Sequence, residues 1–360
     1  MRSMSAKILV IFLLVMFLVM VFNFQESIAA PTQKTFKVVW SIYAGWQPWD
    51  YAQQSGILKK WADKYGIIIN LARMDYIPSI EAFVAKKADA CVMTNMEALD
   101  MPAASGISTT SIIVGDYSNG NDAVLTRNAL GIKGLSGKPI YIVELSVSHY
   151  LLARALEING LKESDVTLVN TSDSDIAPAF IANKKQEVVV TWNPLVMKIL
   201  QEPGITKVFD SSKIPGEILD LMVVRTDVLQ ANPELGKALT GAWYEVMALM
   251  SKPGPKADEA MTIMAQSAGC SLIEYKAQLK TTAMFYDPKQ AAVYSAGAEM
   301  QNKMNYVRNF CFKHRLLGEN AQSVDEVGIR YPGGKIQGRN DRVRLIFDDT
   351  YMKLSASGKL

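Results

Sequence analysis

Short apolar runs alternate with segments of helical periodicity along most of the chain. The runs that predict strands lie at residues 36–43, 67–71, 90–93, 111–114, 139–143, 166–169, 188–190 and 219–225. Helices are predicted between them at residues 48–65, 80–86, 96–105 and 151–158. Because strands that alternate with helices form mostly parallel sheets, this pattern predicts an α/β fold.

The pattern changes after residue 232, where helical periodicity dominates. Further helices are predicted at residues 235–250, 257–267, 272–282 and 291–313. Beyond residue 317 the periodicity is poor. We therefore expect loops in the last forty residues, with one final helix near residues 348–354.

Polar and aromatic side chains gather at three successive strand ends between residues 131 and 194. Ligands of open α/β sheets bind outside the carboxyl ends of strands, where helix N-termini and loops converge. The candidate residues at these strand ends are Glu144, Ser146, Ser148, Asp175 and Trp192. This stretch predicts a small-molecule site.

The first third of the chain supplies further candidates at its own strand ends. Trp46 lies in the loop after the first strand, and Asn95 and Glu97 follow the strand at residues 90–93. Asp116 lies in residues 115–122, a segment rich in turn-forming residues. We interpret that segment as the first crossing between two lobes.

Most of these candidates also have a purely structural interpretation. Glu144 or Asp175 can stabilise the start of the following helix, and Ser146 can cap it. Trp192 can pack between lobes, and Asp116 can shape the turn in which it lies. The sequence leaves both interpretations open.

The first 29 residues have the features of an export signal. Arg2 and Lys7 precede an uninterrupted apolar run of 15 residues, 8–22, and Ser27-Ile-Ala29 forms a small-residue cleavage site. A membrane-spanning helix needs about 20 apolar residues, so a cleaved signal is favoured over a retained anchor. We expect an exported, soluble mature chain.

Length and charge limit the remaining possibilities. About 330 mature residues exceed what one core usually holds, so two lobes are expected. We predict lobe 1 from residues 30–118 and 216–360, and lobe 2 from residues 119–215. Without the signal, 38 basic and 35 acidic residues become 36 and 34, a net charge of +2. This balance and the lack of a basic run with aromatics argue against a nucleic-acid partner.

Metal and cofactor sites are not expected. The chain has three cysteines and two histidines, with no CxxC and no Cys/His cluster. Cys91 lies in an apolar run and is predicted to be a buried small residue. Cys270 and Cys311 could form a disulfide in an oxidising compartment, a pairing that the sequence leaves open.

Several motifs resemble the periplasmic solute-binding proteins of ABC importers, in the branch for nitrate, taurine and sulfonates. The motifs are Leu135–Ile140, Ser146–Leu152, Gly160–Val166 and Trp192–Pro194, supported by residues 77–90 and 176–182. The resemblance extends over about residues 37–224. It implies a type II fold with lobe 2 inserted in lobe 1 and a hinge between them. It also implies a monomer in the periplasm that delivers a small solute to the permease subunits of an importer, without catalysis.

This chain departs from the branch in the charge of its candidate site. The branch commonly has a small residue where this chain has Glu144, which leaves helix N-terminal amides free for an anion. Carboxylates at several strand ends together with indole rings suit a small planar cation. The pattern resembles the subgroup associated with urea carboxylase, which implies guanidine or urea, and the several acids favour guanidinium. The alternative is an anion binder for nitrate, taurine or another sulfonate, with Arg73 or Lys198 reaching into the cleft.

An enzyme on the same scaffold is the third possibility. Pyrimidine synthases for thiamine resemble this family, but their cysteine-rich iron motif is absent. Ser148 and His149 suggest a hydrolase, yet neighbours on one helix point about 100° apart. No GxSxG turn is present either. A binding protein is therefore favoured.

Overall fold

The computed structural model describes residues 33–360. The predicted export signal, residues 1–29, lies outside these described residues. Within the described part, no helix combines the length and the apolar character needed to cross a membrane.

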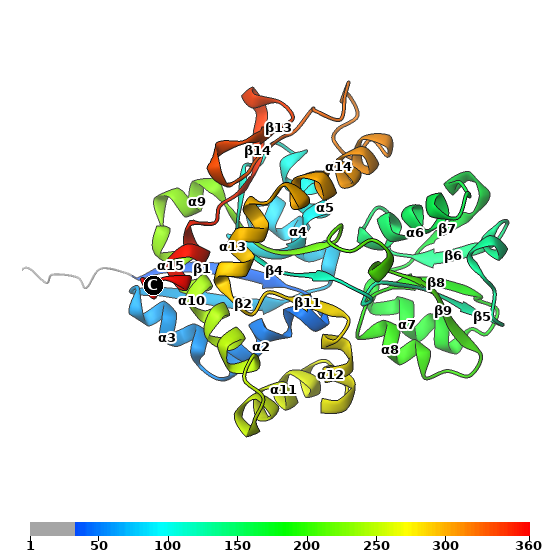
Figure 1. Cartoon of the computed structure of the whole chain (residues 1–360), viewed down its shortest axis with the longest axis horizontal. Coiled ribbons are helices and arrows are strands. Elements are labelled where there is room, and N and C mark those ends of the chain that lie inside the picture. The colour runs from blue at the N-terminus through cyan, green and yellow to red at the C-terminus, as the bar shows by residue number, and fades with distance from the viewer. Residues whose placement is uncertain (1–32) are drawn as a thin grey trace, which may run out of the picture. The chain divides into compact units, whose positions relative to one another are not determined.

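A nine-stranded sheet forms the centre of the first lobe (Figure 1). Its strands are β1 (Lys34–Trp40), β2 (Ile67–Arg73), β3 (Ala90–Thr94), β4 (Thr109–Ser118), β10 (Leu219–Arg225), β11 (Thr282–Met284), β12 (Gly328–Arg330), β13 (Ile336–Gln337) and β14 (Val343–Phe347). Their order is β13-β12-β14-β4-β10-β3-β1-β2, with β11 paired to β4. All five residues of β3 are buried, as expected for a central strand covered on both faces.

A five-stranded sheet forms the centre of the second lobe. Its strands are β5 (Ala123–Arg127), β6 (Pro139–Ile142), β7 (Thr167–Asn170), β8 (Val188–Thr191) and β9 (Ile205–Asp210), in the order β7-β6-β8-β5-β9. Figure 1 shows α6 (Val147–Ile158) on one face of this sheet and α7 (Asp173–Ala182) and α8 (Leu195–Leu200) on the other.

Both sheets are mixed rather than mostly parallel. β10 runs antiparallel to β3 and β4, and β5 runs antiparallel to β8 and β9. These two strands are the first after each crossing of the chain between the sheets, which explains their reversed direction. The strand pairs β1–β3, β6–β7 and β6–β8, which belong to the predicted strands, are parallel, as expected.

The two crossings lie side by side. The hydroxyl groups of Ser118 and Ser211 are 2.7 Å apart, and the amide of Gly120 donates to the Ser211 oxygen at 2.7 Å. Gly120 has a φ of 120°, a conformation that residues with a side chain rarely adopt. Serine hydroxyls therefore join the two crossings.

The remaining helices surround the first sheet. They are η1 (Ala44–Trp46), α2 (Gln47–Gln54), α3 (Ile57–Lys64), α4 (Tyr76–Val84), α5 (Asn95–Ala98), η2 (Leu99–Ala103), α9 (Thr226–Ala231), α10 (Pro233–Met250), α11 (Pro255–Ser267), α12 (Leu272–Leu279), α13 (Pro288–Ala296), α14 (Ala298–Lys313) and α15 (Thr350–Ala356). Short helical turns lie at η3 (Ile132–Leu135), η4 (Glu163–Asp165), η5 (Ser211–Lys213), η6 (Pro332–Gly334) and η7 (Asn340–Arg342).

Three predictions about elements need correction. The helix predicted at residues 48–65 is two helices, because Gly56 adopts a left-handed φ of 78° between α2 and α3. The helix predicted at residues 291–313 is broken at Gly297, which lies in the extended region. The last forty residues are not loops, since β12 and β14 pair with each other and β14 joins β4.

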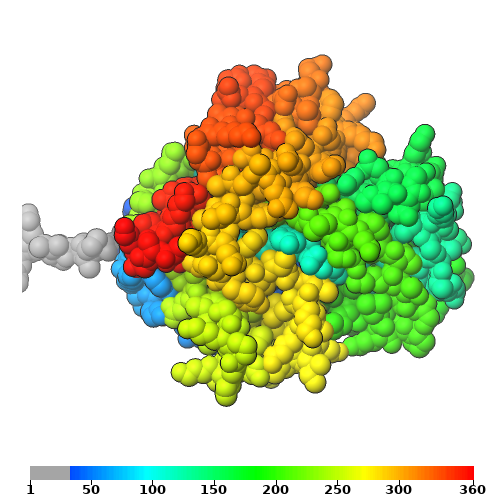
Figure 2. All heavy atoms as spheres, in the orientation of Figure 1, coloured from blue at the N-terminus to red at the C-terminus, as the bar shows by residue number. Residues whose placement is uncertain are grey.

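The two lobes contact each other on both sides of the crossings. At the α12 side, Gln201 donates to Glu274 at 2.8 Å. At the α14 side, His314 and Lys313 contact Glu163 at 3.1 and 3.0 Å. Figure 2 shows the yellow and orange C-terminal segments meeting the green atoms of the second lobe. The structure therefore has its lobes in contact rather than apart.

Candidate functional site

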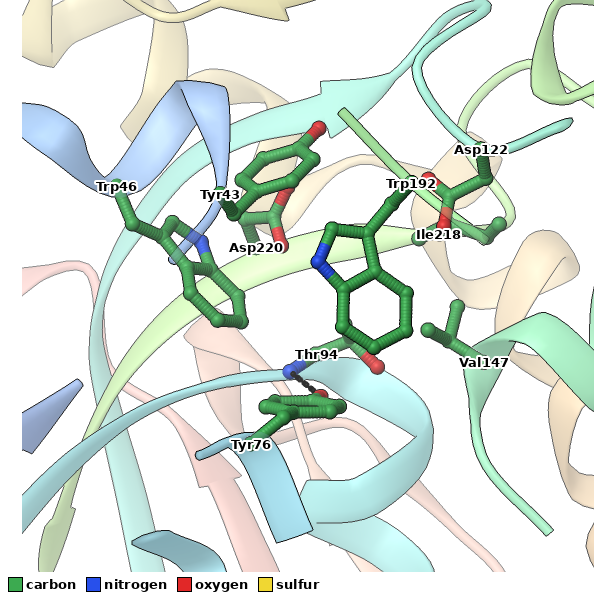
Figure 3. Close-up of a pocket in the computed structure, with 9 residues that line it drawn as sticks. All are labelled: Tyr43, Trp46, Tyr76, Thr94, Asp122, Val147, Trp192, Ile218 and Asp220. Atoms are coloured by element: carbon green, nitrogen blue, oxygen red, sulfur yellow. Dashed lines mark hydrogen bonds between the residues drawn. The ribbon is translucent and has the colours of Figure 1, made fainter. Parts of the chain in front are cut away.

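A small cavity lies between the two sheets, at the ends of their strands (Figure 3). Its lining residues are Tyr43, Trp46, Tyr76, Thr94, Asp122, Val147, Trp192, Ile218 and Asp220. The cavity measures about 20 Å³ for the centres of water-sized atoms. That is little more than one water molecule requires, so this closed arrangement suits a solute of few atoms. The lining contains aromatic and acidic residues but no Lys or Arg.

Four aromatic side chains form the walls. Tyr43 and Trp46 follow β1, Tyr76 begins α4, and Trp192 follows β8 in the second lobe. Ring centroids are 5.3 Å apart for Tyr43 and Trp46, 5.5 Å for Trp46 and Tyr76, and 5.7 Å for Tyr76 and Trp192. Trp192 also donates its indole N–H to the carbonyl of Ile42 at 3.1 Å, across the lobes. The rings thus form a continuous aromatic wall contributed by both lobes.

Three buried aspartates lie close to this wall. Asp220 of β10 lies opposite Asp116 of β4 in the strand register. Burial raises the pKa of Asp116 to about 7. Burial and the facing charge of Asp116 raise the pKa of Asp220 well above its ordinary value. Asp122, just before β5, is also buried, and burial raises its pKa to about 7.

Glu97 adds a fourth carboxylate at the floor of the site. Its side chain is fully buried. One carboxylate oxygen accepts the amide N–H of Val147 at 2.8 Å, and the other accepts the hydroxyl of Thr94. Burial raises the pKa of Glu97, while the hydrogen bonds from Thr94, Tyr76 and Val147 oppose that rise.

None of these four carboxyl groups forms an ion pair with a Lys, Arg or His of residues 33–360. A buried carboxylate without a basic partner is costly, and it either keeps its proton or awaits a cation. Burial raises the pKa of all four groups, which favours their protonated forms when no cation is present.

Four of the residues predicted from the sequence come together here. Trp46 and Trp192 line the cavity directly. Glu97 touches the lining residues Thr94 and Val147. Asp116 lies behind the wall, opposite Asp220.

Five predicted residues do not line the cavity. Glu144 is exposed, because Leu145 takes a left-handed φ of 59° and the chain turns away. Asp175 is exposed and accepts the hydroxyl of Ser172 at the start of α7. Asn95 is buried, but its side-chain amide donates to the carbonyl of Glu217 and accepts the backbone N–H of Leu219.

The two serines of this group are buried beside the first turn of α6. Ser146 caps the helix, accepting the amide N–H of Ser148 at 3.2 Å. The hydroxyl of Ser148 has no hydrogen-bond partner among the described residues and does not belong to the lining. Ser146 therefore shapes the helix start, and neither serine lines the cavity.

Sequence reasoning missed most of the wall. The missed residues are Tyr43, Tyr76, Thr94, Asp122, Val147, Ile218 and Asp220. One signal was available for Asp220, which is a single carboxylate inside the apolar strand Leu219–Val224. A charge in such a strand is rare unless it is paired or functional. Nothing comparable distinguishes Tyr43 or Tyr76 from ordinary core tyrosines.

The only two histidines of the chain meet away from the cavity. His149 and His314 both contact the carboxylate of Glu163, at 2.9 and 3.1 Å. Ligand atoms of the three residues lie within 4.8 Å of one another, as in a metal site. However, Nδ1 of His149 accepts the amide N–H of Leu145 at 3.2 Å, so its Nε2 carries the hydrogen. A metal-binding histidine donates its other N–H instead, so this cluster is better suited to hydrogen bonding.

The three cysteines are free. Cys91 and Cys311 are buried and Cys270 is partly exposed. Cys91 is the buried small residue that its apolar run predicts. The pairing considered for Cys270 and Cys311 is not formed.

Residues 118–253 match the model of a family described as NMT1/THI5 like. This stretch covers the first crossing, the second sheet, β10 and α10. No curated protein sequence shows significant similarity to the chain.

Solved structures share the fold. The alkanesulfonate-binding protein SsuA from Xanthomonas axonopodis pv. citri, bound to MOPS, is 15% identical with a TM-score of 0.65, over 83% of this chain and 99% of that one. SsuA from Escherichia coli is 15% identical with a TM-score of 0.65, over 81% and 96%. The nitrate-binding protein NrtA from Synechocystis PCC 6803 is 10% identical with a TM-score of 0.56, over 90% and 99%. The predicted periplasmic-binding-protein fold, with the second lobe inserted in the first, is confirmed.

Proposed function

We propose that this protein is the extracytoplasmic solute-binding component of an ABC importer and that it captures a small nitrogenous solute, guanidinium or urea. The observation that carries the proposal is a closed cavity walled by Tyr43, Trp46, Tyr76 and Trp192, with acidic residues and no Lys or Arg in its lining. Guanidinium is the favoured solute because the surrounding carboxylates have no other cation to balance them.

The expected interactions set a rough upper limit on the affinity for guanidinium. A micromolar dissociation constant corresponds to about 8 kcal/mol. A desolvated cation against an aromatic face contributes roughly 2 kcal/mol, and each hydrogen bond to a charged group about 1.5–3 kcal/mol. Two carboxylates and two ring faces sum to roughly 7–10 kcal/mol. The cost of immobilising the solute is subtracted from this sum, so we expect a dissociation constant weaker than micromolar.

Capture works by closure of the two lobes over the solute. We place lobe 1 at residues 30–118 and 216–360 and lobe 2 at residues 119–215, joined at the serine-linked crossings. Trp46 and Asp220 would contact the solute from lobe 1, and Trp192 and Asp122 from lobe 2. A solute touched by both lobes stabilises the closed state, which then docks on the permease. The protein is proposed to act in the periplasm as a monomer, without catalysis.

The alternative solute is an anion. Its support is the fold shared with sulfonate-binding and nitrate-binding proteins. An anion in this cavity would lie against Asp122 and Asp220 without a basic side chain in the lining. The cavity therefore favours the cation.

Isothermal titration of the mature protein with guanidinium chloride, urea, sodium nitrate and taurine tests the proposal. We expect binding of guanidinium, with weaker or no binding of urea, and none of the two anions. Urea can satisfy the indole N–H of Trp46, which has no acceptor among the described residues. Heat with nitrate or taurine alone would overturn the choice of solute and leave the transport role to the anion alternative.

A further inference from the structure

The start of α6 faces the cavity and is suited to bind a charged group. α6 runs for 12 residues and its first residue, Val147, lines the cavity. The first amide groups of a helix have no partner within the helix and carry partial positive charge. Such helix starts are common binding positions for anions. Ser146 takes the amide of Ser148, which leaves the amide of Val147 directed toward the other lobe.

The amide of Val147 is occupied by a residue of the protein itself. Glu97 comes from α5 of the first lobe and accepts this N–H at 2.8 Å. Its second oxygen is held by the hydroxyl of Thr94, itself a lining residue. With both oxygens accepting hydrogen bonds, the carboxylate is fixed across the lobe boundary.

We propose that Glu97 determines solute charge by occupying the anion-binding start of α6, so that the closed site rejects anions and accepts cations. This inference rests on the proposed solute-binding function and assigns its specificity to one residue. The carboxylate acts as an internal anion at the position where an anionic solute would otherwise bind.

A second feature supports the same preference independently of the helix start. Asp122 and Asp220 line the opposite part of the cavity, and neither forms an ion pair among residues 33–360. An anion would have to displace Glu97 and also approach these two groups. Like charges a few ångströms apart in a partly buried site repel by several kcal/mol at an effective dielectric of about 20. A cation instead favours the ionised forms of Asp122 and Asp220, which burial otherwise disfavours.

The test compares Glu97→Ala and Glu97→Gln with the unaltered protein in titrations with guanidinium chloride, sodium nitrate and sodium methanesulfonate. For Glu97→Ala we expect guanidinium affinity to fall at least tenfold and measurable binding of nitrate or methanesulfonate to appear. Glu97→Gln keeps the size of the side chain and an acceptor for Val147, so we expect only the tenfold loss of guanidinium affinity. The matched control is Glu144→Gln, which neutralises an exposed glutamate near the same helix start.

A second variant identifies where the new anion binds. Proline is well tolerated at the first position of a helix and has no amide N–H. Adding Val147→Pro to Glu97→Ala should therefore abolish the gained anion binding. Anion binding that survives this second substitution would overturn the assignment to the helix start.

The remaining outcomes separate this inference from the proposed function. If Glu97→Ala folds, keeps its guanidinium affinity and still rejects both anions, the role of Glu97 is overturned while guanidinium capture stands. If Glu97→Ala does not fold, the role of Glu97 is tested by Glu97→Gln alone. Unchanged guanidinium affinity in Glu97→Gln would then overturn that role. If the unaltered protein ignores guanidinium but Glu97→Ala gains anion binding, the proposed solute fails and the role of Glu97 is supported.

Discussion

The buried aspartates around the cavity carry the chemistry of the site at the scale of single residues. Asp116, Asp122 and Asp220 are almost fully buried and have no basic partner among residues 33–360. Keeping such groups ionised costs free energy, which is why burial raises the pKa of each. A protein that only needed stability would gain from neutral residues here. The buried acids are therefore the feature on which the proposed cation specificity rests.

Asp220→Asn tests whether the buried carboxyl group of Asp220, which costs stability when ionised, contributes to solute binding. We expect guanidinium affinity to fall at least tenfold, about 1.4 kcal/mol, because a charge-assisted partner is lost. The melting temperature of the empty protein should rise at alkaline pH, because Asp116 no longer faces a second carboxyl group. Calorimetry and circular dichroism measure the two effects, with the exposed Asp175→Asn as control. A lower melting temperature with unchanged affinity would make Asp220 a structural residue.

Guanidinium affinity should depend on pH. The pKa values of Asp116 and Asp122 are raised to about 7, and a cation beside the lining residue Asp122 favours the ionised forms of both. Affinity should therefore rise between about pH 5.5 and about pH 8, with proton release on binding. Titrations in buffers of different ionisation enthalpy count the released protons. Equal affinity across this range would contradict the role of these carboxyl groups.

The empty protein should show the opposite trend in stability. A carboxyl group with a raised folded-state pKa contributes stability that is full below its ordinary pKa of 3.8. That contribution is lost as the pH rises to about 7, the folded-state value of Asp116 and Asp122. The increase in melting temperature produced by guanidinium should accordingly grow over the same range. Thermal scans with and without the cation check both trends.

At the scale of elements, the short helix η1 positions the aromatic wall. Gly45 lies in this helix, and a Cβ there would be 2.6 Å from a carboxylate oxygen of Asp116 and 2.7 Å from the ring of Tyr43. Real Cβ atoms do not approach other atoms so closely, so either the acid or the ring would have to move. The lack of a side chain at residue 45 lets η1 pack against the charged strands.

Gly45→Ala should disturb the cavity more than the fold. Displacing Asp116 or Tyr43 shifts the wall, so we expect guanidinium affinity to fall about tenfold or more. The cost in stability should be about 1–3 kcal/mol, typical of an overpacked site. Titration and chemical denaturation measure these effects. The control is Gly131→Ala, where a Cβ meets nothing and φ is −74°. Unchanged affinity would show that η1 adapts without moving the site.

Comparison of the predicted and observed elements shows which features of the fold the sequence predicts. β10 was predicted at residues 219–225 and lies there, because a buried apolar run leaves little choice. β14 was missed, because a short strand interrupted by Arg344 forms only by pairing with β4, far away in the sequence. Glu144 was placed correctly at a strand end, but the backbone turn at Leu145 decides where it points. Local periodicity predicts elements, whereas side-chain direction depends on turns and distant pairing.

At the scale of the whole molecule, contacts outside the cavity hold the lobes together. On the second lobe, Glu163 is bonded to His149 within its own lobe, and it accepts His314 and Lys313 from the first lobe. Phe310 of α14 packs edge-on against His149 and Tyr150 of α6. In the proposed capture by lobe closure, these contacts break when the lobes open. We therefore expect them to slow solute release.

Glu163→Gln tests this contact between lobes. Burial alone would raise the pKa of Glu163, but hydrogen bonds from His149, His314 and Lys313 lower it well below its ordinary range. Losing the charge should weaken the closed state, so we expect guanidinium to dissociate about three to ten times faster while association changes little. Stopped-flow fluorescence of the cavity tryptophans measures both rates. Glu187→Gln, which removes an ion pair with Lys138 inside the second lobe, should change neither.

The pH dependence of this effect identifies its origin. A carboxyl group with a lowered pKa stabilises the folded protein fully above its ordinary pKa of 4.5, and the stabilisation declines as the pH falls toward the folded-state value. The difference in melting temperature between the unaltered protein and Glu163→Gln should therefore be largest near neutral pH and shrink below about pH 4. Glu163 is partly exposed, so salt should reduce the difference as well. A difference that is constant with pH would mean that the packing of Phe310 against α6, and not the charge of Glu163, holds the lobes closed.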